Sequence, residues 1–243
     1  LSCALPNQSM NDLELMRLRL DVLYTYDDRG RLLLSNEPIE SARVPGPELA
    51  IALSGNCRVM RYGPGLKDEL VDRLEAIPAD HLTHGGVDVF RGAVEAMLRP
   101  FGDWEHSGGP AYRFPHIPDF SEEAVEITSE NRGVFRDDLQ WYSDEYDQWG
   151  RGFAIVRGGS AVSACYSSRI DDLSAEAGLW THPDFRGRGL ARYVTQSWAA
   201  GVFESGRIPF YSTSFDNLAS QSVARKLGLI QIGQDMAFRL SLP

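Results

Sequence analysis

HPDFRGRGLA, residues 182–191, is the stretch that decides the fold of this chain. An apolar strand pattern enters it and a helical pattern leaves it. Gly187 and Gly189 let the backbone bend sharply, which leaves consecutive N–H groups free at the start of a helix. Arg186, Arg188 and Arg192 bring positive charge to the positive end of that helix. The stretch therefore predicts an anion site suited to a phosphate or a pyrophosphate.

The class of phosphate ligand is narrowed by the spacing of the glycines. A Walker-type loop ends in Gly-Lys-Ser/Thr, which is absent here, and a dinucleotide fingerprint needs a glycine where Arg192 stands. The pattern that fits is Arg-x-x-Gly-x-Gly/Ala, formed by Arg186, Gly189 and Ala191. A turn of this kind at the start of a helix, with no ligand, is the alternative for this stretch taken alone.

A second motif follows at a fixed distance. It runs from Asn217 to Leu229 and contains Lys226-Leu227-Gly228. Between and before the two motifs, the chain predicts a strand, a hairpin, a strand, the loop with its helix, a strand, a short helix and a final strand. With both motifs in this order, residues 123–243 resemble the GNAT superfamily of N-acetyltransferases, in a bacterial branch with an extra N-terminal region.

The resemblance implies an α/β (α+β) fold with a mixed, mostly antiparallel sheet, flanking helices and a splayed central strand pair. The strand ending at Thr181 is expected to part from residues 209–213 and to admit the pantetheine arm of acetyl-CoA, the implied co-substrate. No metal is implied. The residues that would bind this co-substrate are Leu179, Trp180, Thr181, Arg186, Gly187, Arg188, Gly189, Leu190, Ala191 and Asn217. Asn217 also suits a helix cap, and the two roles are compatible.

The implied reaction is acyl transfer to a primary amine of a small molecule or a protein, which needs a general base. Glu176 is the first candidate for that base, and an exposed strand glutamate without a catalytic role is the alternative. Relatives place a tyrosine on the last short helix to protonate the departing thiolate, but Ala224 stands there in this chain. Tyr211 and Ser220 are weaker candidates for the proton donor.

The first half of the chain lies outside the resemblance. Its patterns predict helices at residues 11–20, 66–77 and 87–98, a hairpin around residues 27–30 and a strand at residues 57–62. Residues 102–118, rich in Gly, Pro and His, predict a linker with one short strand near Tyr112. The expected domains are therefore 1–118, a smaller α/β domain, and 119–243. Whether the first is a degenerate copy of the second stays open, because no internal repeat is found.

Composition limits the partners. The 243 residues carry a net charge of −10, which disfavours nucleic acids and acidic membranes as partners. Three cysteines without paired spacing predict a reducing, cytoplasmic compartment, and no apolar run reaches the ~20 residues of a membrane span. The opening residues lack the basic start and apolar run of a signal peptide. The oligomeric state and the acceptor stay open, with a dimer among the alternatives.

Other interpretations compete with that of a transferase. One is a non-catalytic acyl-CoA-binding sensor, because the usual tyrosine is missing. Another is a metal site at His81 and His84, which lacks a third ligand, and another is Cys165 as a nucleophile, which a core strand would make inert. A helix is predicted at residues 129–146, and its aromatic residues suit a core better than a substrate pocket. These aromatic residues are Phe135, Trp141 and Tyr142, together with Trp149, which follows the helix.

Overall fold

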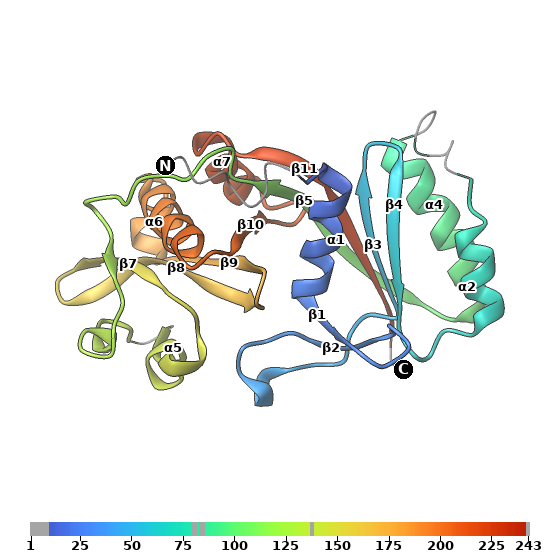
Figure 1. Ribbon diagram of the computed structural model, residues 1–243, viewed down its shortest axis with the longest axis horizontal. Helices are drawn as coiled ribbons and strands as arrows, with labels where there is room; N and C mark the ends of the chain where they lie inside the picture. Colours follow the sequence, from blue (N-terminus) through green and yellow to red (C-terminus); the bar gives the residue numbers. More distant parts are fainter. Residues whose placement is uncertain (1–9, 79–81, 83–85, 137–138, 242–243) are drawn as a thin grey trace.

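One large sheet organises the molecule. The structure is a computed structural model that describes residues 10–78, 82, 86–136 and 139–241. Nine of the strands within these residues form a sheet in the order β4-β3-β11-β5-β10-β9-β8-β7-β6 (Figure 1). Their bounds are β3 Leu49–Ser54, β4 Cys57–Tyr62, β5 Trp104–Arg113, β6 Val125–Glu126, β7 Phe153–Arg157, β8 Ser160–Ile170, β9 Ser174–Thr181, β10 Ile208–Ser212 and β11 Ile230–Leu240.

The sheet is mixed and mostly antiparallel, which confirms the predicted fold class. β9 and β10 run parallel, whereas the other neighbouring strands run antiparallel. A separate hairpin joins β1 (Tyr24–Tyr26) to β2 (Leu32–Ser35), and Gly30 adopts a φ of 73° in its turn. This hairpin was predicted from Asp27-Asp28-Arg29-Gly30.

The predicted linker at residues 102–118 is wrong over most of its length. Residues 104–113 form β5, a ten-residue strand that lies between β11 and β10 in the middle of the sheet. Its glycines have a packing function, because a Cβ on Gly109 would lie 1.8 Å from the carbonyl oxygen of Thr213. Strand β3 was not predicted either. Strands from both halves thus share one sheet, and a domain boundary at residue 118 stays a prediction.

Helix α1 (Asp12–Leu23) covers one face of the sheet centre. It begins at a capping box, in which Asn11 accepts from the amide of Glu14 and the Glu14 carboxylate accepts from the amide of Asn11. Its buried side chains include Leu15, Met16 and Leu20, which pack with residues of β3, β10 and β11. The helix extends three residues beyond the predicted range, to Leu23.

The other helices cover the remaining faces. Along β10, Phe210 packs in the cluster beneath α1, whereas the next residue, Tyr211, packs in the cluster of α6 (Leu190–Glu204), so these two helices cover opposite faces. Successive side chains of β3 also point to opposite faces of the sheet. Those on one face pack with α1, and those on the other pack with α2 (Asp68–Glu75) and α4 (Gly86–Leu98), as Figure 1 shows at its right-hand side. The last helix, α7 (Leu218–Lys226), lies beside the start of α6.

The predicted helix at residues 129–146 is wrong. The described part of this segment contains a 3-10 turn at Arg132–Val134, the short helix α5 (Gln140–Asp144) and a 3-10 turn at Tyr146–Gln148. Aromatic packing decides its path, because Phe135, Tyr142 and Trp149 are buried against β7 and β8. These residues are therefore core, as the sequence favoured, while Trp141 is partly exposed and packs edge-on against Trp149.

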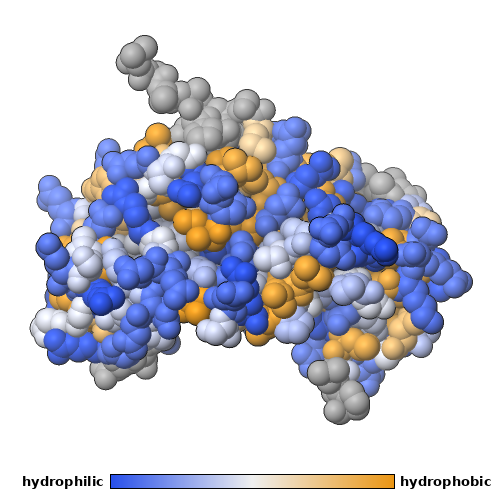
Figure 2. Space-filling view, turned by 60° about the horizontal axis from the view of Figure 1, so that its bottom comes forward, coloured by the Kyte–Doolittle hydropathy of each residue, from blue (hydrophilic) through white to orange (hydrophobic). Residues whose placement is uncertain are grey.

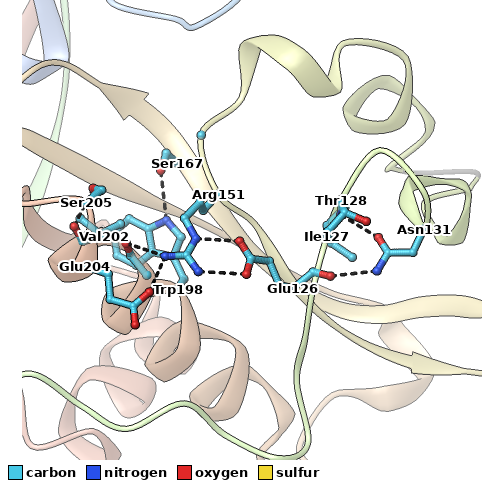
Figure 3. A network of polar contacts seen from close by, with 12 residues as sticks. Glu126, Ile127, Thr128, Asn131, Arg151, Ser167, Trp198, Val202, Glu204 and Ser205 are labelled. Carbon is cyan, nitrogen blue, oxygen red and sulfur yellow. Dashed lines mark hydrogen bonds and ion pairs between the residues drawn. The ribbon is translucent and has the colours of Figure 1, made fainter.

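Arg151 connects the edge of the sheet to α6. Its guanidinium donates to both carboxylate oxygens of Glu126, at 2.6 and 2.9 Å, and to Glu204 at 2.8 Å (Figure 3). On the same helix, the Trp198 indole donates to Ser167 of β8 at 3.1 Å. These bonds fix α6, whose first turn carries the predicted anion site, on its sheet.

Replacing Arg151 by methionine is expected to lower the free energy of unfolding by about 1–2 kcal/mol. The bidentate pair is stronger than an ordinary surface pair, but both partners are about one-third exposed, so solvent reduces its contribution. Urea unfolding measures the change. Arg157→Gln is the control, since its single bond to Glu123 joins two half-exposed side chains and is expected to contribute under about 0.5 kcal/mol. Equal losses in the two variants would contradict the assignment.

Hydrophilic residues cover most of the face in Figure 2, and hydrophobic residues form separated patches on it. In the described part of the chain, no helix has the combined length and apolar character that a membrane crossing requires.

Candidate active site

The parallel strands β9 and β10 diverge partway along their length. Their pairing covers Ile208 with Ser174, Pro209 with Ala175 and Phe210 with Glu176, and goes no further. β9 nevertheless continues to Thr181, held by β8 on its other side. In the part of the chain that the structure describes, no strand pairs with the other edge of residues 177–181, and the predicted parting of the two strands is present.

The loop after β9 holds a row of amides. Gly187 and Gly189 have φ values of 76° and 77°, a conformation that side-chain-bearing residues adopt at a cost. Among the described residues, the amides of 187–189 donate to no acceptor. Those of Leu190 and Ala191 lie in the first turn of α6, where no helix carbonyl is available to them. Five consecutive N–H groups, those of residues 187–191, thus remain available to bind an anion. We call them the amide row.

Three arginines adjoin this row of amides in the chain, namely Arg186, Arg188 and Arg192. Arg186 donates to the carbonyl of Thr181 at 3.1 Å, and Arg188 donates to the carbonyl of Asp184 at 2.9 Å while lying over the ring of Phe185. Arg192 bonds the hydroxyl of Tyr193. None of the three forms an ion pair within the described residues. Their charge is therefore available to a ligand, at the positive end of α6.

The strand edge and the amide row border the same cleft. It has a volume of about 530 Å³ and lies between β9, the loop and α7. Asn217 lines it and caps α7, since its side chain accepts from the amide of Ser220 at 3.0 Å. The cleft brings together nine of the ten predicted co-substrate residues, namely Leu179, Trp180, Thr181, Arg186, Gly187, Gly189, Leu190, Ala191 and Asn217. Arg188 is part of the same loop.

Glu176 lies where the strands diverge, but it is not an exposed strand residue. It is 4% exposed, and its Oε2 accepts from Nε of Arg19 at 3.1 Å while its Oε1 accepts from the hydroxyl of Ser212 at 2.6 Å. Arg19 also pairs with Asp235 at 2.6 Å. Burial by itself would lower the pKa of Arg19, but the carboxylates of Asp235 and Glu176 raise it above its ordinary value.

Sequence reasoning missed Arg19. The available signal was a charged residue on the apolar stripe of a helix, between Met16 and Leu20, because such a residue is buried only with partners. Nothing local indicates which partners those are, since Glu176 lies 157 residues away.

Tyr211 and Ser220 lie together beside the cleft. Their hydroxyl oxygens are 2.7 Å apart, and Ser220 lines the cleft with Tyr211 buried behind it. Burial raises the pKa of the Tyr211 hydroxyl well above its ordinary value, so this group stays protonated at neutral pH. Ala224 is fully buried. The two hydroxyl groups therefore form a hydrogen-bonded pair at the wall of the cleft.

Two of the alternative interpretations concern other residues. Cys165 is fully buried, and burial raises the pKa of its thiol, which fits the inert interpretation. His81 and His84 lie outside the described residues. No group of three or more potential metal ligands occurs in the part of the chain that the structure describes.

The comparison with known families agrees with this geometry. Residues 118–235 match the family model described as GNAT acetyltransferase, a range that contains β9, the loop, α6, β10 and α7. Residues 118–235, just under half of the chain, therefore form a GNAT-like acetyltransferase domain.

Individual proteins are similar to this chain in sequence or in structure. Over 89 residues the chain is 34% identical to the uncharacterized N-acetyltransferase YdfB of Bacillus subtilis, a match that covers 36% of this chain and 34% of that protein. The match thus spans about a third of the curated relative's length. Among solved structures, a GCN5-related N-acetyltransferase-like protein of Streptococcus suis is 16% identical, with 93% of this chain and 99% of that chain covered and a TM-score of 0.48. A GNAT-family acetyltransferase of Colwellia psychrerythraea is 13% identical, with 75% and 76% covered and a TM-score of 0.48.

Proposed function

We propose that this protein transfers an acetyl group from acetyl-CoA to a primary amine of a small molecule or a protein. The observation that carries the proposal is the junction of two features in one cleft. Within the described residues, β9 pairs with β8 alone at residues 177–181, so its other edge is unpaired, and the amide row at residues 187–191 has no acceptor. A diphosphate fits the second feature, and a chain of amide groups fits the first as an added strand.

The chemistry assigns tasks to the residues around the divergence. The amine nitrogen attacks the thioester carbonyl carbon, the C–S bond breaks, the amine gives up one proton and the sulfur takes one. Backbone N–H groups near Leu179 stabilise the charge that develops on the carbonyl oxygen. Glu176, acting through a water molecule, takes the proton of the amine. Because Glu176 is buried and bonded to Arg19 and Ser212, we propose that it takes this proton through the water molecule and does not contact the amine itself.

The hydroxyl of Ser220, which is hydrogen-bonded to that of Tyr211, is proposed to deliver the proton that the sulfur takes. Ser220→Ala is expected to lower kcat by about 10²-fold, the low end of the range for general acid–base catalysis, with the Kd of acetyl-CoA unchanged. Ser222→Ala is the matched control, because Ser222 lines the same cleft without a hydrogen bond to Tyr211. Steady-state kinetics and calorimetric titration measure both quantities. A Ser220→Ala variant with the kcat of the control would remove Ser220 from the mechanism.

The test of the whole proposal is the release of free CoA from acetyl-CoA in the presence of a panel of alkyl amines and basic peptides. We expect amine-dependent release together with a rise in Tm on adding acetyl-CoA. The second candidate, an acyl-CoA sensor, is favoured by one observation, the buried Ala224 at the position of the usual tyrosine. It predicts the rise in Tm without any release. The cytoplasm is the proposed setting, because the described cysteines, Cys57 and Cys165, are free.

A further inference from the structure

Arg19 is an arginine in the interior of the protein. It belongs to α1, in the half of the chain outside the matched family region, and it is 3% exposed. The neighbours on its helix face, Leu15, Met16 and Leu20, are fully buried apolar residues. Burying a guanidinium there costs desolvation free energy, so Arg19 needs hydrogen-bonding and oppositely charged partners in the interior.

Those partners come from three different strands. Nε donates to Glu176 of β9 at 3.1 Å, Nη1 to Asp235 of β11 at 2.6 Å and Nη2 to Ser212 of β10 at 2.7 Å. Ser212 then donates to the other oxygen of Glu176 at 2.6 Å. Arg19 and Ser212 therefore occupy both carboxylate oxygens of Glu176, which fixes the direction in which that side chain points.

The cluster lies at the point where β9 and β10 diverge. Glu176 belongs to the last paired position, opposite Phe210, and Ser212 is two residues further along β10 on the same face. This is the face that α1 covers, opposite the face of α6. Asp235 accepts in addition from the amide of Gly109. Burial and then the charge of Asp235 raise the pKa of Tyr24, whereas the charge of Arg19 lowers it.

We propose that Arg19 is a positioning residue of the acyl-transfer site, through which the N-terminal half of the chain orients Glu176 at the strand divergence for an amine acceptor. The inference rests on the proposed function and extends it, because it makes the N-terminal helix part of the reaction rather than a separate domain. Loss of this orientation is expected to affect the chemical step, since a misplacement of about 1 Å can cost about 10²-fold in rate. It leaves the loop at residues 186–191 untouched.

The test compares Arg19→Gln with Arg19→Lys. We expect Arg19→Gln to lower kcat about 10²-fold while the Kd of acetyl-CoA stays within about twofold of the parent, and Arg19→Lys to recover at least about tenfold of the loss, because the ammonium restores the charge. Arg17→Gln is the matched control, an exposed arginine on the same helix, and is expected to leave both quantities unchanged. A merely structural role would weaken acetyl-CoA binding together with turnover.

The possible results distinguish failure of the proposed function from failure of the inference about Arg19. If the parent protein releases no CoA with any amine, the proposed function is wrong and the inference falls with it. If the parent is active and Arg19→Gln keeps its kcat, the inference alone is wrong. Should Arg19→Gln fail to fold, Ser212→Ala replaces it, since it removes one donor to Glu176 and keeps the ion pair. That variant is expected to lose about tenfold in kcat at constant Kd, and an unchanged kcat would overturn the inference.

Discussion

Replacing Gly109 by alanine is expected to destabilise the protein by more than about 3 kcal/mol. A Cβ at this position would lie 1.8 Å from the carbonyl oxygen of Thr213 and 2.9 Å from the carbonyl carbon of the next peptide unit, at Ser214. Both are backbone atoms in a close-packed interior, so no side chain can move aside to relieve the contact. The strand in question, β5, lies between β10 and β11, and its displacement would disturb both. Urea unfolding followed by circular dichroism measures the loss.

Gly92→Ala is the matched control for this prediction. Gly92 is exposed in the interior of α4, and a Cβ there meets no atom within 4 Å. The same substitution is then expected to stabilise the protein by about 0.5–1 kcal/mol, because alanine has the higher helix propensity. If Gly109→Ala were as stable as the parent, β5 could not lie against Thr213 as described.

Replacing Gly189 by valine is expected to weaken acetyl-CoA binding by at least about 10²-fold. Gly189 has a φ of 77°, and a β-branched residue in that conformation is strained by about 1–3 kcal/mol, so the loop would adopt another path. Each amide that then misses the diphosphate loses a hydrogen bond to a charged group, worth about 1.5–3 kcal/mol. Two such losses suffice for the expected effect. Calorimetric titration with acetyl-CoA measures the Kd.

Gly206→Val controls for the strain itself. Gly206 follows α6 with a φ of 79°, and a Cβ there also meets no atom within 4 Å, but it lies at the other end of the helix from the cleft. It is expected to lose stability and to keep the Kd of the parent. An equal loss of affinity in both variants would mean that the effect is general destabilisation rather than loss of the amide row.

The parts of the site that are local in sequence could be predicted. Two glycines between a strand and a helix, here Gly187 and Gly189, indicate a turn with positive φ. Asn217 indicates a helix cap, because its side-chain oxygen can accept from a backbone amide in the first turn. The divergence of β9 from β10 followed from the family resemblance rather than from any periodicity. The catalytic roles of Glu176, Tyr211 and Ser220 remain predictions.

The parts that depend on distant contacts could not be predicted. The Gly108-Gly109-Pro110 segment has the composition of a linker, but the backbone of Asp235 approaches Gly108 closely and that of Thr213 approaches Gly109, which explains why a central strand contains these two glycines. Arg19 on an apolar helix stripe indicates a buried ion pair, but its partners are set by the packing of α1 across three strands. The segment 129–146 has helical spacing, yet the burial of its aromatic rings against β7 and β8 overrides it.

Backbone hydrogen exchange, measured with and without acetyl-CoA, tests most directly whether the parted strands and the loop together bind the co-substrate. We expect the amides of residues 187–191 and the free edge at residues 177–181 to become protected on adding acetyl-CoA, with Gly189→Val abolishing the effect at both places. Protection confined to other segments, or none at saturating acetyl-CoA, would contradict the account.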